Sequence, residues 1–218
     1  MLPRLVFLWN HGELSEVRKL GSRALELIIA ICIPASIGIF ILAPQIVHVI
    51  FGMDFLPCIL TLRIFAPFIL ISTIGNLYGT QLLMTFNEEK ILLITVSVGA
   101  LLNMLMNFFL IPKMQQNGAA IASVITETVV LCLQIYFVNK QVRLNCSLHF
   151  LKTIFLIVVV MILYLMIVTK FLNGDISIII CSIFGSGFIY ISLGILLKNE
   201  AILYFVRLVK NKVLRCKK

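Results

Sequence analysis

Glu127 has the clearest potential for chemistry in this chain, because it is an acidic side chain in the middle of a long apolar segment. A carboxylate at the centre of a membrane helix costs about 3 kcal/mol on insertion scales, so it needs either a partner or a task. Two interpretations follow. Glu127 is an acid that exchanges a proton or pairs with a cation, or it forms a structural hydrogen bond between two helices.

Asn103 is the predicted partner of Glu127 in the structural interpretation. The apolar segments on either side of residue 115 are expected to form a helical hairpin, which brings Asn103 opposite Glu127 and Asn107 opposite Ser123. Polar pairs of this kind between membrane helices contribute about 0.6 to 2 kcal/mol each. Such a pair would lower the cost of burying the acid without giving it a chemical task.

Arg63 is the only basic residue well inside an apolar segment. Its planar guanidinium group suits the binding of phosphate oxygens two at a time, but its charge can also extend to the membrane surface. Asn76 and Gln81 follow in the same segment and are candidates to line a polar cavity. The neighbouring Gly75-x-x-x-Gly79 pattern is also typical of close helix packing.

Six apolar segments must position these residues, and each is about as long as a helix that crosses the hydrocarbon core. None shows the polar face of a helix in a water-soluble protein. Hydrophobic residues make up 61% of the chain and charged residues 12%, which excludes a water-soluble globular domain. The sequence predicts an all-α, polytopic transmembrane helix bundle with six spanning helices. They cover residues 24–51, 58–86, 91–112, 118–139, 150–169 and 176–197.

The net charge of +9 is unevenly distributed. Most of the basic residues lie in residues 1–23, 87–90, 139–152 and 198–218, which are alternate connections of the predicted bundle and its two ends. Basic connections stay on the cytoplasmic side. The pattern therefore predicts cytoplasmic termini and a lipid bilayer, not nucleic acid, as the partner of the basic residues.

No motif of an enzyme is present in the sequence, and its six cysteines are scattered singly without metal-ligand spacing. We therefore expect no catalytic residue, no metal and no cofactor.

Several short motifs follow one another in an order that resembles a known family. They are Pro3-Arg4, Gly12-Glu13, residues 33–38, residues 50–55, residues 87–90, Asn103-x-x-x-Asn107, residues 111–113, and residues 118–122 followed by Glu127. In this order and spacing, residues 1–140 resemble the polysaccharide flippases for O-antigen and capsule repeat units. These flippases belong to the multidrug/oligosaccharidyl-lipid/polysaccharide exporter superfamily.

The resemblance implies the C-terminal lobe of a two-lobe flippase fold. Residues 1–23 would be a cytoplasmic or interfacial segment, residues 24–139 a four-helix part of the lobe, residues 140–198 a terminal transmembrane pair, and residues 199–218 a basic amphipathic cytoplasmic tail. The other wall of the cavity would come from a separate N-terminal lobe or from another copy of the chain.

The activity that the resemblance implies is alternating access that flips an undecaprenyl-type lipid-linked oligosaccharide across the bacterial cytoplasmic membrane for polysaccharide biosynthesis. The candidate cavity residues are Arg63, Asn76, Gln81, Asn103, Asn107 and Glu127. Two alternatives stay open: a cation-coupled multidrug exporter in which Glu127 is the coupling acid, and an inactive truncated remnant.

Overall fold

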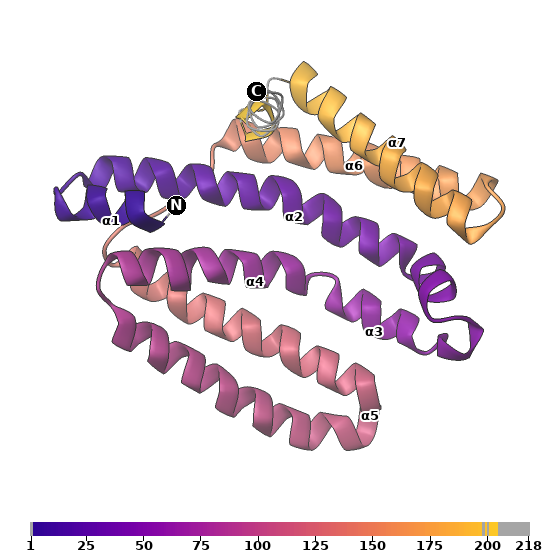
Figure 1. Cartoon of the computed structure of the whole chain (residues 1–218), viewed down its shortest axis with the longest axis horizontal. Coiled ribbons are helices and arrows are strands. Elements are labelled where there is room, and N and C mark those ends of the chain that lie inside the picture. Colours follow the sequence, from indigo (N-terminus) through magenta and orange to yellow (C-terminus); the bar gives the residue numbers. More distant parts are fainter. Residues whose placement is uncertain (1, 198, 200, 205–218) are drawn as a thin grey trace, which may run out of the picture.

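The computed structural model describes residues 2–197, 199 and 201–204, and its regular elements in this part of the chain are all helical (Figure 1). One of them, η1, is a short 3-10 helix, and another, η2, is a π-helix. In chain order the elements are α1 (Leu2–Asn10), α2 (Leu14–Ile50), η1 (Met53–Phe55), α3 (Cys58–Phe65), α4 (Phe68–Asn76), η2 (Leu77–Leu83), α5 (Glu89–Asn139), α6 (Leu148–Phe171) and α7 (Asp175–Leu196).

Five helical stretches among the described residues are long and apolar enough to cross a membrane: α2, the stretch Cys58–Leu83, α5, α6 and α7. The predicted all-helical membrane protein is thereby confirmed. The ends of α6 and α7 lie within two residues of the predicted segments 150–169 and 176–197. The predicted amphipathic tail, residues 199–218, lies outside the described residues except for Asn199 and residues 201–204.

The long helix α5 reverses its direction at Gln115, whose backbone is non-helical (φ 50°, ψ −128°). A first arm (residues 89–114) and a second arm (residues 116–139) therefore lie side by side (Figure 1). The arms are close because glycines face the opposite arm: a Cβ on Gly118 would lie 2.4 Å from the carbonyl oxygen of Leu110. The predicted hairpin with its turn near residue 115 is confirmed.

Helix α2 is the central helix of the bundle. It contacts α3 and α4 on one side and α6 and α7 on the other (Figure 1). It begins at Leu14, ten residues before the predicted apolar segment, because hydropathy marks only the part of a helix that is suited to hydrocarbon. In this polar first part of α2, Lys19 forms an ion pair with Glu16 at 3.3 Å.

The predicted segment 58–86 is divided into three pieces. Pro67 lies between α3 and α4, where a proline cannot donate the helical hydrogen bond. The hydroxyl of Ser36 on α2 donates to the carbonyl oxygen of Ala66 at this break, over 2.7 Å. After α4 the chain continues directly into η2.

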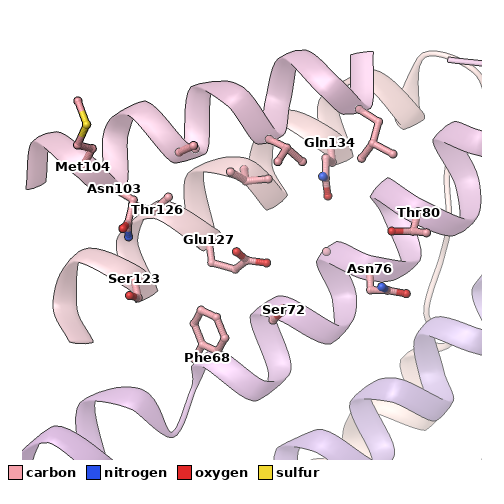
Figure 2. Close-up of a pocket in the computed structure, with 16 residues that line it drawn as sticks. Phe68, Ser72, Asn76, Thr80, Asn103, Met104, Ser123, Thr126, Glu127 and Gln134 are labelled. Atoms are coloured by element: carbon pink, nitrogen blue, oxygen red, sulfur yellow. The ribbon is translucent and has the colours of Figure 1, made fainter. Parts of the chain in front are cut away.

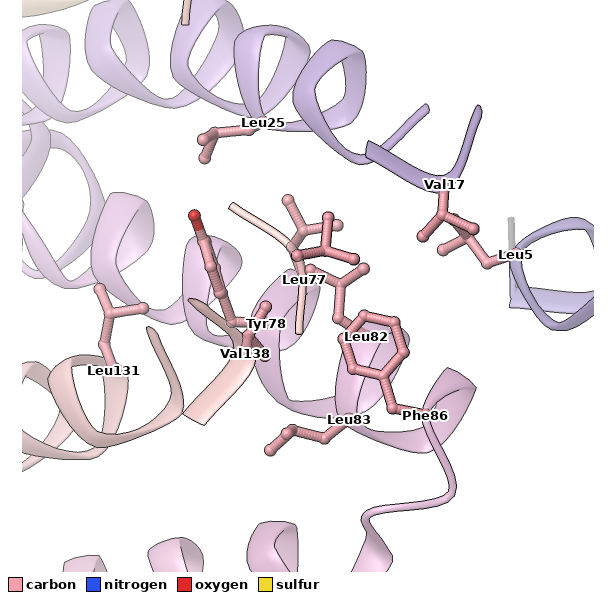
Figure 3. Packing of buried hydrophobic residues seen from close by; sticks show 11 residues of the cluster. Leu5, Val17, Leu25, Leu77, Tyr78, Leu82, Leu83, Phe86, Leu131 and Val138 are labelled. Carbon is pink, nitrogen blue, oxygen red and sulfur yellow. The ribbon is translucent and has the colours of Figure 1, made fainter. Parts of the chain in front are cut away.

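A hydrophobic core lies at one end of the bundle and surrounds η2 (Figure 3). Leu82 is fully buried there, and the rings of Trp9 and Phe86 pack with their centroids 4.5 Å apart. The loop after α5 is fastened to α2 at the same end, since the backbone N–H of Ser147 donates to the Glu26 carboxylate over 2.9 Å. This core holds η2, and with it one wall of the pocket described next.

Candidate functional site

A pocket of about 590 Å³ lies between the α4–η2 stretch and the two arms of α5 (Figure 2). Polar side chains from four helical pieces share its lining, although the surrounding helices are strongly apolar. They are Ser72 and Asn76 of α4, Thr80 of η2, Asn103 of the first arm, and Ser123, Thr126, Glu127 and Gln134 of the second arm.

Of the described residues that line the pocket, Glu127 alone is ionisable. It lies twelve residues from Gln115 and twelve from Asn139, so about 18 Å of helix separates it from either end of its arm. Its side chain points across the pocket toward α4, where a Cβ on Gly75 would lie 3.4 Å from Oε1 (Figure 2). Among the described residues this half-buried carboxylate forms no hydrogen bond or ion pair, so it is available to a ligand or a partner.

Gln134 lies two turns beyond Glu127 on the same face of the second arm. A Cβ on Gly79 would lie 2.7 Å from its Nε2 atom, so the glycine makes room for the carboxamide. Gln134 is 4% exposed, and its Oε1 has no hydrogen-bond partner in the described part of the chain. The sequence analysis missed this residue, although the spacing of seven from Glu127 was a usable signal.

Thr126 adds a second buried oxygen to the same wall. Its Oγ1 has no hydrogen-bond partner among the residues described, and the residue is 7% exposed. Buried polar atoms normally find partners. The unpaired oxygens of Thr126 and Gln134, with the Glu127 carboxylate, therefore suit a ligand that donates hydrogen bonds, such as the hydroxyl groups of a sugar.

Asn103 and Glu127 line the same pocket, but the hydrogen bond between them that the structural interpretation required is not formed. Asn103 Oδ1 instead accepts from Asn107 Nδ2 on its own arm, over 2.8 Å. The side chain of Asn107 lies outside this pocket, and its Oδ1 is buried without a partner in the described structure. The hairpin predicts how deep these residues lie along the helices. It does not predict how each helix is rotated about its axis, which decides the direction of the side chains.

The structure places Arg63 and Gln81 away from the pocket lining, whereas Asn76 belongs to it. Arg63 Nε donates to the carbonyl oxygen of Phe40 over 3.3 Å, and its guanidinium group lies 5.6 Å from the centre of the Phe40 ring. Gln81 lies on η2, and its side-chain oxygen is buried without a partner among the residues described.

The wall formed by η2 is itself unusual. π-Helical turns are rare and occur frequently at functional sites. This one contributes Thr80 to the lining and carries Gly79, which faces Gln134. In the part of the chain that the structure describes, no group of three or more His, Cys, Asp or Glu side chains could hold a metal ion.

Comparison with known proteins gives two matches. The family model described as lipid II flippase MurJ matches residues 1–197. The chain is also 29% identical over 104 residues to a protein of Escherichia coli (strain K12) named "Putative O-antigen transporter". That alignment covers 48% of this chain and 25% of the relative, so the chain spans well under two thirds of the relative's length.

Proposed function

The chain belongs to the lipid II flippase MurJ family, and from this premise we propose that it is part of a transporter that moves a lipid-linked oligosaccharide across the membrane. The matching family model and the E. coli relative are named for flipping and for transport. The observation that carries the proposal is the polar pocket around Glu127, which is lined by helical stretches that are long and apolar enough to cross a membrane.

The proposed arrangement has six crossings. The two arms of α5 would cross separately, because each is long enough to span the hydrocarbon core at 1.5 Å per residue. With the basic connections inside, both termini would be cytoplasmic, and the bacterial cytoplasmic membrane would be the location. In this proposal residues 24–139 form four helices of a C-terminal lobe and residues 140–198 the terminal pair.

The proposed substrate is an undecaprenyl-type lipid-linked repeat unit of O-antigen or capsule. The resemblance in residues 1–140 and the E. coli relative support this choice. The pocket offers hydroxyl and amide groups and one carboxylate, which suit sugar hydroxyls better than phosphate. Cationic groups for a pyrophosphate would therefore come from a second lobe, because Arg63 lies outside the pocket.

Complementation in two bacterial strains tests this proposal. One strain lacks its repeat-unit flippase and is assayed for surface polysaccharide, and the other is depleted of its lipid II flippase and is assayed for growth. The chain is expressed in each strain alone and together with the N-terminal half of a relative.

We expect surface polysaccharide in the first strain when both halves are present. Rescue of growth in the second strain instead would make lipid II the substrate. Failure in both strains, with both polypeptides shown to be in the membrane, would contradict the proposed function.

A further inference from the structure

Two prolines lie inside the central helix α2, at positions 34 and 44. A proline has no backbone N–H, so the carbonyl four residues earlier loses its helical hydrogen bond. The carbonyls concerned are those of Ala30 and Phe40. In the hydrocarbon region water cannot replace the missing donor, so each unpaired carbonyl would be costly.

A side chain from another helix reaches each of these two carbonyls. The hydroxyl of Tyr190 on α7 donates to the carbonyl oxygen of Ala30 over 2.5 Å. Arg63 on α3 donates through Nε to the carbonyl oxygen of Phe40 over 3.3 Å, and its guanidinium group also lies over the Phe40 ring.

These two contacts lie on opposite sides of α2, because α7 packs on one side and α3 on the other (Figure 1). Tyr190 and Arg63 therefore hold the middle of α2, residues 30–44, between the α6–α7 pair and the helices that build the pocket. Both hydrogen bonds end on a carbonyl that a proline has freed, and this distinguishes them from ordinary packing contacts.

We propose that Tyr190 and Arg63 are positioning residues. Each donates a hydrogen bond to the carbonyl that a proline of α2 leaves unpaired, and together they fix the middle of α2 relative to α7 and α3. The structural part of this inference is independent of the proposed function, and its effect on transport rests on that function.

A double-mutant cycle in detergent-solubilised protein tests the structural part. The four chains are wild type, Tyr190→Phe, Pro34→Ala and the combination. Tyr190→Phe should lower the folding equilibrium constant about threefold to fifteenfold when Pro34 is present, which is the range for hydrogen bonds between membrane helices. The loss should nearly vanish with Pro34→Ala, because the restored N–H then satisfies the Ala30 carbonyl.

Tyr164→Phe is the matched control. The Tyr164 hydroxyl donates to the carbonyl oxygen of Cys181 over 3.0 Å, and no proline frees that carbonyl. Its effect should be the same with and without Pro34→Ala. An equal loss from Tyr190→Phe in both backgrounds would overturn the proposal for Tyr190.

The second cycle combines Arg63→Met with Pro44→Ala and is measured both by unfolding and by the complementation assay. Arg63→Met should lower stability and surface polysaccharide, and Pro44→Ala should restore both. A folded Arg63→Met, Pro44→Ala chain that stays inactive would show instead that Arg63 acts on the substrate. If the wild-type chain supports no transport, the proposed function fails, and the unfolding cycle alone decides the role of Arg63.

Discussion

The imidazole of His48 and the carboxylate of Asp175 meet at 3.2 Å between Nδ1 and Oδ2, although 127 residues separate them in the sequence. His48 lies in the last turn of α2, and Asp175 is the first residue of α7. The contact joins the ends of these two helices, and both side chains are partly exposed. Together with the hydrogen bond from Tyr190 to Ala30, it is a second polar contact between α2 and α7.

We expect His48→Ala and Asp175→Ala each to lower the free energy of unfolding by about 0.2 to 1 kcal/mol, the range for exposed side-chain pairs of this kind. The double variant should lose little more than either single variant, because each substitution removes the same contact. Chemical unfolding of the four chains at one pH measures this coupling. Fully additive losses would show that the contact does not form in the membrane protein.

The packing of the two arms of α5 gives a second prediction. A Cβ on Gly99 would lie 2.4 Å from Cγ2 of Val130, and the stiff valine has little freedom to move away. Gly99→Ala should therefore destabilise the chain by about 1 to 3 kcal/mol. Adding Val130→Ala should recover part of this loss, because it removes the colliding methyl group.

Gly38→Ala on α2 is the control for this prediction, since nothing lies within 4 Å of a Cβ at that position. Alanine favours a helix over glycine, so the control should be neutral or slightly stabilising. Thermal unfolding in detergent compares the variants. Similar losses from Gly99→Ala and Gly38→Ala would contradict the close contact of the two arms.

A third prediction concerns Cys146 in the loop between α5 and α6. Burial raises the pKa of its thiol, and the nearby Glu26 carboxylate raises it further. Because the thiolate is the reactive form, the folded chain should react with a maleimide more slowly than a free thiol at the same pH, and the rate should increase as the pH rises.

Glu26→Gln should speed this reaction at a fixed pH. The substitution removes a negative charge and lowers the pKa of Cys146 toward its ordinary value, while the amide oxygen can still accept from Ser147. The reaction is followed in a variant in which the other cysteines are replaced by alanine. Equal rates for the folded and the denatured chain would contradict the account of this loop.

Apolar length was the most reliable predictor of this fold. It placed α6 and α7 within two residues of their ends, and the turn at Gln115 followed from the Pro and Gly residues around it. Apolar length predicted the start of α2 ten residues too late, because a helix can continue beyond the hydrocarbon into polar sequence. The division at Pro67 and the π-helical turn of η2 depend on tertiary packing, which hydropathy does not record.

The candidate site was only partly predictable for a related reason. Glu127, Asn103 and Asn76 line one pocket, as their depth in the bundle suggested, but Gln81 and Asn107 point elsewhere. Depth follows from counting residues along a helix, whereas the rotation of that helix is set by the partners against which it packs. Arg63 shows this most clearly, since it donates to a carbonyl that Pro44 frees on another helix.

Surface polysaccharide made by a Glu127→Gln chain in the complementation assay is the most direct test of the claim that the pocket lies on the transport path. The amide keeps the size and hydrogen-bonding capacity of the side chain but removes its charge. Thr128→Ala, at an exposed neighbouring position outside the pocket, is the control. We predict that Glu127→Gln loses most of the polymer at an unchanged amount of protein in the membrane, while Thr128→Ala retains it. Wild-type polymer from Glu127→Gln would contradict the account.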